Sequence, residues 1–294
     1  MKIRDSFTDR IFNTVNLSII ITLLLIVLYP LIYVLSASIS SPDAVGSGEV
    51  VLWPIGFTLE GYFRIFREKY VLIGYRNTLF YTITGTTLNM LLTLPCAYAL
   101  SKKDLPGRKI IMGIFLFTMY FSGGMIPSFL LVKSLGLVNT RVVLIILGAV
   151  SVYNIIISRT FFAAIPKDLE EAAYIDGCSR TRTFTQIVLP ISKALMGVMV
   201  LYYAVAHWNS YFSAMIYITN DDYKPLQLFL RRILIIDSLN LNMVGGDELE
   251  MDAEALKQLV KYSIIIVSSL PILILYPFLQ KYFEKGILIG SIKG

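Results

Sequence analysis

The residues best suited to chemistry lie in a charged segment, residues 164–190, within an otherwise apolar chain. At its centre is the stretch EEAAYIDGCSRTRTFTQIVLP, which runs from Glu170 to Pro190. The chain contains no H-E-x-x-H or G-x-S-x-G motif, so these charges do not indicate hydrolytic catalysis. Charged and small residues on short helices are suited to docking into a groove on a soluble partner. The alternative is a solvated loop that happens to be helical.

Local signals predict a helix, a glycine turn and a second helix in this charged segment. Pro166 fits a first helical turn, where its missing N–H is not needed. The acidic residues after it favour the positive end of a helix; they are Asp168, Glu170 and Glu171. The pattern stops at Gly177, just after Asp176, as a left-handed glycine would stop it. A second helix over 179–188 precedes Pro190. One small-residue face is predicted from Ile165, Leu169, Ala172 and Ala173.

The rest of the chain predicts an all-α, polytopic membrane protein with a single permease domain over residues 1–294. Hydrophobic residues make up 56% of the chain and charged residues only 16%, against about a quarter charged in soluble proteins. The apolar residues occur in blocks close to the ~20 residues that span a bilayer. Six spans are predicted, at residues 12–36, 77–100, 109–132, 142–163, 191–219 and 260–280.

Two connections between the predicted spans are long. Residues 37–76 contain turn-forming Gly46 and Gly48 and then the stretch LEGYFRIFREKY, whose apolar residues recur at helical spacing. These residues are Leu59, Tyr62, Phe63 and Phe66. The pattern predicts a helix lying on the membrane surface. Residues 220–259 end in an acidic run that lacks the spacing of a calcium loop and is expected to be solvated.

Lysine and arginine residues indicate the orientation. They are concentrated in the two ends of the chain, in the loop at 101–109 and in the charged segment. Because basic residues mark the cytoplasmic side, both termini are predicted to be cytoplasmic. The apolar run at 11–35 has no small-residue cleavage site and is expected to be a first span. The net charge of +6 is explained by this topology, so nucleic-acid binding is not predicted.

The charged segment resembles the EAA loop of ABC importer permeases. In that family the pattern is E-A-A, three residues, G, nine residues, I, one residue and L-P. The matching positions here are Glu171, Ala172, Ala173, Gly177, Ile187, Leu189 and Pro190. The resemblance implies a type I importer architecture in which this loop couples to a cytoplasmic ATPase. It also implies a second homologous permease subunit, two ATPase subunits and an external binding protein in a bacterial cytoplasmic membrane.

Further stretches are similar to the carbohydrate group of these permeases, in particular the small maltose-permease-type subunit. The quoted stretches are FTLEGYFRIF, YRNTLFYT, SKKDLPGRK and the ending FEKGILIGSIKG. HWNSYFSAMIYI and PLQLFLRRIL resemble the LplC–YtcP-like branch, which implies a sugar or oligosaccharide substrate. The ending implies an ATPase-contacting tail through Lys285, Gly286 and Gly290, with glycines that let an extended chain approach another backbone.

No cofactor or metal is predicted for this chain. It has no G-x-x-x-x-G-K-[ST] stretch, so ATP and Mg are expected on the partner ATPase. A substrate pathway is predicted near His207, Trp208, Asn209 and Tyr211, because an aromatic ring and an amide suit a sugar. The alternative for these polar side chains is hydrogen bonding between helices.

Two other functions remain open from the sequence. An ABC permease for a non-sugar solute would carry a similar charged segment. A secondary carrier driven by ions usually places carboxylates inside the membrane, but the second, third and fourth predicted spans contain no acidic residue.

Overall fold

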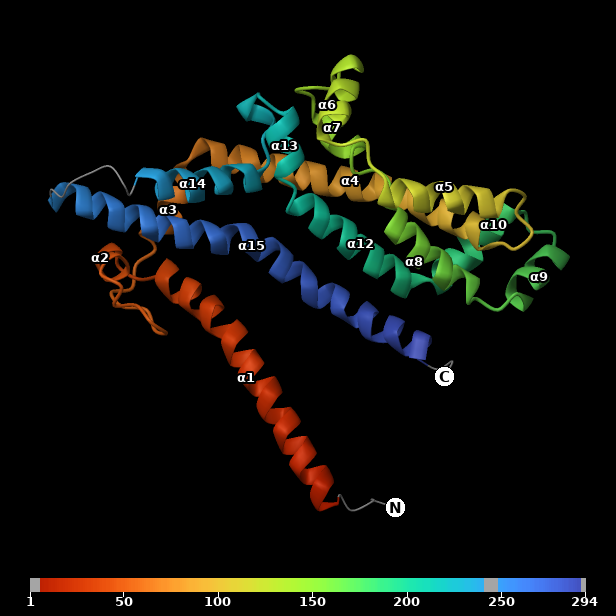
Figure 1. Ribbon diagram of the computed structural model, residues 1–294, viewed down its shortest axis with the longest axis horizontal. Helices are drawn as coiled ribbons and strands as arrows, with labels where there is room; N and C mark the ends of the chain where they lie inside the picture. Colours follow the sequence, from red (N-terminus) through yellow and green to blue (C-terminus); the bar gives the residue numbers. More distant parts are fainter. Residues whose placement is uncertain (1–5, 241–247, 292–294) are drawn as a thin grey trace. The chain divides into compact units, whose positions relative to one another are not determined.

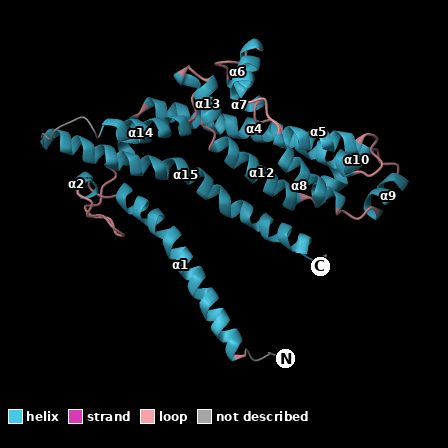
Figure 2. Ribbon diagram, viewed as in Figure 1, coloured by secondary structure: helices cyan, strands magenta, loops and turns pink. Residues whose placement is uncertain are grey.

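A computed structural model describes residues 6–240 and 248–291 of the chain. Helices account for most of the described residues, which contain no strand (Figure 2). This confirms the predicted all-α class. The chain divides into two compact units, residues 1–69 with 230–270 and residues 70–229 with 271–294. We call them the first unit and the second unit; the single permease domain stays a prediction.

The first unit is packed around the C-terminal end of α1 (Phe7–Ser38). Its helices are α1, α2 (Pro42–Gly46), α3 (Glu60–Arg67) and parts of α14 (Leu226–Asn240) and α15 (Glu248–Ser291). A small core joins α1, α2 and α15 through Ala37, Ala44, Val45, Val50 and Leu259. Tyr33 and Tyr262 add an edge-to-face ring contact with centroids 5.5 Å apart. Helix α1 continues away from this core as one long helix (Figure 1). Most of its apolar side chains are exposed.

The second unit contains the charged segment and most of the remaining helices. They are α4 (Lys69–Ser101), α5 (Arg108–Tyr120), α6 (Met125–Ser134), α7 (Arg141–Ile146), α8 (Val152–Ala163), α9 (Asp168–Ile175), α10 (Arg180–Thr183), the π-helix η1 (Phe184–Val188), α11 (Leu189–Ile191), α12 (Lys193–Trp208), α13 (Phe212–Tyr217), the 3-10 helix η2 (Asp221–Tyr223) and residues 226–229 at the start of α14. Helix α8 packs against both α5 and α12, and α13 packs against α7. Helix α4 runs past them and contributes to both buried clusters of this unit.

Within residues 6–240 and 248–291, three helices are long and apolar enough to cross a membrane: α1, α4 and residues 255–277 of α15. They correspond to the predicted spans 12–36, 77–100 and 260–280. The prediction of a polytopic membrane protein is therefore confirmed. The prolines inside these helices, such as Pro95 in α4, do not end them.

The other three predicted spans are not continuous, which corrects the sequence prediction. Residues 109–132 form α5 and α6, bent by 111° where Gly124 takes a left-handed φ of 87° that an α-helix does not contain. Residues 142–163 divide into α7 and α8, because Ser151 caps a new helix by accepting from the Asn154 N–H. Residues 191–219 divide into α12 and α13. Two bent pairs, α5 with α6 and residues 180–191 with α12, can each count as one span, which gives up to five spans in the described residues; six remains a prediction.

Two connections also contain more helix than predicted. The helix expected within residues 59–70 is confirmed as α3, which only Glu68 separates from α4; its place on the membrane surface stays a prediction. The connection at 220–259 is not a loop throughout, because η2, α14 and the start of α15 occupy most of its described residues. Helix α15 begins at Glu248, so the end of the acidic run belongs to a helix. Asp247, where that run starts, lies outside the described residues.

Candidate functional site

The first half of the charged segment folds as predicted. Helix α9 carries its carboxylates in the first turn, where the helix dipole favours negative charge. It ends at Gly177, whose φ is +77°. Gly177 N donates to Tyr174 O at 3.1 Å and Cys178 N donates to Ala173 O at 2.9 Å. These two bonds form a Schellman motif, which requires a left-handed residue after the helix. The predicted glycine turn is therefore confirmed.

Helix α9 presents two different faces. Ala173 is only 4% exposed and Glu170 also points inward, with its side chain 12% exposed. On the other face Leu169 is 45% exposed and Ile175 is 86% exposed, with Ala172 between them. Ala172 and Ala173 flank Leu169 at positions i+3 and i+4, but Ala173 is buried whereas Ala172 and Leu169 are exposed. The residues of the predicted small-residue face therefore divide between the inner and the outer face of α9.

The second half of the charged segment is also helical, as predicted, but it is not a regular α-helix. Helix α10 begins where Ser179 Oγ accepts from Arg182 N at 3.3 Å. It passes into η1, a π-helix, just before Pro190, which has no N–H for the carbonyl four residues earlier. Ile187 and Leu189 are half-buried, and Leu189 packs on the core of the second unit. Pro190 itself is exposed.

Two ion pairs join the charged segment to the end of α4 and the loop after it. Lys102 pairs with Glu170, and the two side chains are 23% and 12% exposed. Lys102 Nζ also lies 4.1 Å from the centroid of the Tyr98 ring. Arg180 pairs with Asp104 at 3.3 Å, but these side chains are 75% and 67% exposed. The first pair is sheltered from water and the second is not, so the first contributes more to holding α9 in place.

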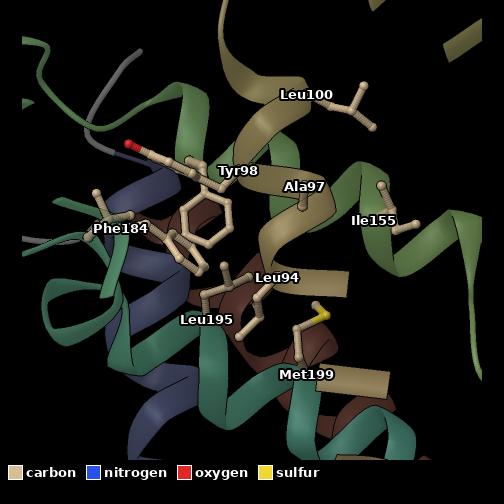
Figure 3. Packing of buried hydrophobic residues seen from close by; sticks show 10 residues of the cluster. Leu94, Ala97, Tyr98, Leu100, Ile155, Phe184, Leu195 and Met199 are labelled. Carbon is tan, nitrogen blue, oxygen red and sulfur yellow. The ribbon is translucent and has the colours of Figure 1, made fainter. Parts of the chain in front are cut away.

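Aromatic rings extend this contact into the core of the second unit. Tyr98 of α4 stacks on Phe184 of η1 with centroids 4.8 Å apart, and meets Phe162 of α8 edge-on at 5.8 Å. Figure 3 shows Tyr98 and Phe184 beside Leu94 and Leu195, with the Tyr98 hydroxyl turned away from the apolar side chains. Because α4, α8, η1 and α12 all contribute to this cluster, a shift of η1 must displace side chains on the helices behind it.

A cavity of 940 Å³ opens beside these contacts. Its apolar wall includes Leu94, Phe162 and Phe184, and charged side chains such as Lys102 and Glu170 line its other parts. The charged segment therefore borders open space on the side of α4, which leaves room for it to move relative to that helix.

The predicted pathway residues separate into buried and exposed ones. His207 is 8% exposed, and its Nε2 lies 2.7 Å from Asn89 Oδ1. The Asn89 amide nitrogen donates to Gly148 O at 2.5 Å. Since Asn89 Oδ1 can only accept, Nε2 carries the proton. The His207 ring also fills the space beside Gly85, where a Cβ would collide with it.

His207 therefore connects α12 to α4 and to the turn before α8, which agrees with the alternative of hydrogen bonding between helices. Trp208 is 4% exposed and packs edge-on against Tyr75, with centroids 6.2 Å apart. By contrast, Asn209 and Tyr211 lie at the break between α12 and α13 and are exposed. Asn89 was not predicted from the sequence, although an amide side chain inside an apolar helix was a usable signal.

A second group of residues was also missed. Near the start of α4, Asn77 donates to Asp222 O at 2.7 Å and to Lys224 O at 3.0 Å. Tyr81 donates to Tyr223 O at 2.8 Å, and Thr78 Oγ1 accepts from the N–H of residue 226 at 2.9 Å. The sequence contained a signal for this contact: Asn77, Thr78 and Tyr81 are polar side chains at positions i, i+1 and i+4 of the predicted span 77–100.

The end of the chain that was predicted to contact the ATPase is helical and not extended. Helix α15 continues through Lys285, Gly286 and Gly290 to Ser291, so these residues are not the extended chain that was expected. Gly294 lies outside the described residues. Among residues 6–240 and 248–291, no three His, Cys, Asp or Glu side chains are grouped to hold a metal ion.

Comparisons with known proteins agree on one family. The family described as binding-protein-dependent transport system inner membrane component matches residues 71–289. The polygalacturonan/rhamnogalacturonan transport system permease protein YtcP of Bacillus subtilis (strain 168) is 40% identical over 97% of this chain and 99% of its own length. Protein LplC of the same organism is 38% identical, over 97% of this chain and 96% of its own length.

A solved structure also matches the whole fold. It is a chain from the crystal structure of a bacterial ABC transporter involved in the import of the acidic polysaccharide alginate. The TM-score is 0.85 at 35% sequence identity, and the match covers 96% of this chain and all of that chain.

Proposed function

Because the chain belongs to the family of binding-protein-dependent transport system inner membrane components, we propose that it forms half of the translocation pathway of an ATP-driven importer for an oligosaccharide. The family and the helical permease fold agree with the sequence resemblance, which is thereby confirmed. The chain is a transport permease subunit and not an enzyme. An ion-coupled secondary carrier does not fit this family.

The observation that carries the proposal is the outer face of α9. Leu169, Ala172 and Ile175 form an exposed apolar ridge, and Asp168, Glu171 and Asp176 are exposed around it. An apolar ridge with a polar rim is the composition of a protein interface. The inner face is held to the second unit through Glu170 and Ala173. The ridge is proposed to dock into a cytoplasmic ATPase that binds ATP and Mg, and α9 to pass its movement to the membrane helices.

The other subunits of the proposed importer and the orientation of this chain follow from this arrangement. A second homologous permease subunit completes the pathway, two ATPase subunits supply energy, and an external binding protein delivers the substrate. Both termini face the cytoplasm of a bacterial cell whose cytoplasmic membrane the chain crosses several times. Gly286 and Gly290 of α15, with Lys285, are proposed to contact the ATPase pair as part of a helix. Asn209 and Tyr211 are the exposed candidates for substrate contact, and His207 and Trp208 support them from behind.

The substrate class is proposed from the relatives. One is a permease for polygalacturonan and rhamnogalacturonan, and another importer takes up the acidic polysaccharide alginate. Acidic oligosaccharides are therefore the first class to test. A non-sugar solute is the alternative, and binding assays with the associated external protein separate the two.

Purification of the tagged chain from its native membranes in mild detergent tests the proposal. Mass spectrometry is expected to find an ATPase, a second permease and a binding protein with the wild type. Ile175→Asp places a carboxylate in the apolar ridge and is expected to lose the ATPase while keeping the second permease. Ser134→Asp changes an exposed residue at the end of α6 and serves as the control. Recovery of the chain without an ATPase in the wild type would overturn the proposal.

A further inference from the structure

The first unit carries an exposed apolar loop that its own core does not cover. Residues 51–57, VLWPIGF, follow α2 and precede α3. Trp53 is 81% exposed and Phe57 is 70% exposed. We call residues 51–57 the Trp53 loop. An exposed run of large apolar side chains is unfavourable in water, which indicates that another phase or molecule covers it.

The Trp53 loop is fixed to the end of α1. Four hydrogen bonds join it, with the residue after it, to residues 36–41. They run from Ser36 Oγ to Leu52 O (2.6 Å), from Ile55 N to Ser40 Oγ (3.1 Å), from Ser41 N to Ile55 O (2.9 Å) and from Thr58 N to Ile39 O (3.0 Å). Ser36 and Ser40 are buried. The position of Trp53 relative to α1 is therefore set by the fold and not by a free loop.

The end of α1 defines the depth of this loop. The most apolar window of α1 has no buried residue, and the apolar run stops at Leu35, where the sequence changes to SASISS. Ser36 therefore lies where a membrane-spanning helix leaves the hydrocarbon, and Leu52 is bonded directly to it. We infer that the Trp53 loop is seated in the membrane–water interface, with the Trp53 ring among lipid headgroups and upper acyl chains.

Lipid fits this surface better than a protein partner, for two reasons. The segment containing the Trp53 loop is held to the bilayer at both ends, by α1 before it and by α4 after it. Helix α3 exposes Phe63 and Phe66, 66% and 53%, beside the basic residue Arg67. Its opposite face is packed: Gly61 lies against Ser263, and Tyr62 bonds to Ser38 at 2.7 Å. Exposed aromatics with a basic residue are typical of a helix in the headgroup region.

Trp53 allows a direct test, because the chain has two tryptophans and the other, Trp208, is 4% exposed. The purified transporter is reconstituted in phosphatidylcholine brominated at different acyl positions. Subtracting the emission of Trp53→Phe from that of the wild type isolates the Trp53 signal, whatever tryptophans the other subunits contain. Trp208→Phe is the matched control, in which Trp53 must give the same profile.

The inference predicts a loss of Trp53 emission that is largest with bromine nearest the headgroup and smallest with bromine near the chain end. Iodide in the buffer should quench weakly. Strong iodide quenching without quenching by brominated lipid would overturn the inference and assign the loop to an aqueous surface. Insensitivity to both quenchers would also overturn it, because a protein partner would then cover Trp53. None of these outcomes depends on the transported substrate or on ATPase docking.

Discussion

The two ends of α4 are attached to the second unit in different ways. At its Asn77 end, the buried side chains of Asn77, Thr78 and Tyr81 bond to the backbone of residues 222–226. At its Lys102 end, the contacts are the Lys102–Glu170 ion pair and ring stacking on Phe184. The 940 Å³ cavity opens beside the Lys102 end. At the Asn77 end, side chains form hydrogen bonds with backbone groups. At the Lys102 end, side chains contact other side chains beside the cavity.

This difference separates a fixed end from a movable one. Breaking the bonds at the Asn77 end would leave the buried Asn77 amide without partners, which costs free energy. At the Lys102 end, water can enter the cavity and solvate both charges when they separate. A helix held firmly at one end and adjustably at the other can transmit a displacement of α9 as a tilt.

Replacing Asn77 should have the largest effect on stability. Asn77→Ala removes the donor of two carbonyl oxygens in a side chain only 1% exposed, and should lower the free energy of unfolding by about 2–4 kcal/mol. Thermal unfolding of the purified chain in detergent measures this. Thr87→Ala is the control, because Thr87 is exposed and bonds only to its own helix. Equal unfolding temperatures for the two variants would show that the Asn77 end is not the fixed one.

Replacing Glu170 should affect coupling as well as stability. Glu170→Gln leaves Lys102 without its carboxylate in a sheltered position, and should cost about 1–3 kcal/mol. The ratio of substrate uptake to ATP hydrolysis in reconstituted vesicles should fall. The double swap Lys102→Glu with Glu170→Lys keeps opposite charges together and should restore the ratio in part. If Glu170→Gln leaves the ratio of uptake to ATP hydrolysis unchanged, the Lys102–Glu170 pair has a structural role only.

Gly177 tests the turn between the two helices of the charged segment. Gly177→Val forces a β-branched residue to a φ of +77°, which should cost about 1–2 kcal/mol. Uptake should fall while the protein stays in the membrane, because α9 would tilt away from its docked position. No atom lies within 4 Å of a Cβ at this position, so the cause would be the backbone alone. Gly177→Asn, which tolerates this conformation, should behave nearly as the wild type; wild-type uptake in Gly177→Val would contradict the assignment.

The smallest effect is expected at the exposed ion pair. Asp104→Asn removes the partner of Arg180, and both side chains are largely in water. The free energy of unfolding should change by less than about 0.5 kcal/mol, and added salt should remove the difference between variant and wild type. Comparison with Glu170→Gln under the same conditions shows whether shelter from water distinguishes the two pairs. A loss as large as that of Glu170→Gln would refute this distinction.

Local patterns in the chain predicted much of the candidate site. The first-turn carboxylates and Gly177 predicted the bounds of α9, because helix caps depend on residues only a few positions apart. The continuity of three predicted spans was wrong, since a hydropathy pattern does not register a left-handed Gly124 or a capping Ser151. The partners of His207 and Glu170 were also beyond prediction. Asn89 and Lys102 lie far from them in the sequence and approach only after the helices pack.

The sequence by itself determined the membrane class, the family and the charged segment with its turn, because composition, motif spacing and capping are properties of consecutive residues. Only the tertiary structure decided which face of α9 points outward, that His207 is buried by Asn89, and that Trp53 is bonded to the end of α1. It also decided that Asn77, in α4, and Lys102, directly after the end of α4, take part in contacts of different kinds. The physical reason is that burial and hydrogen-bond partners depend on which distant segments meet.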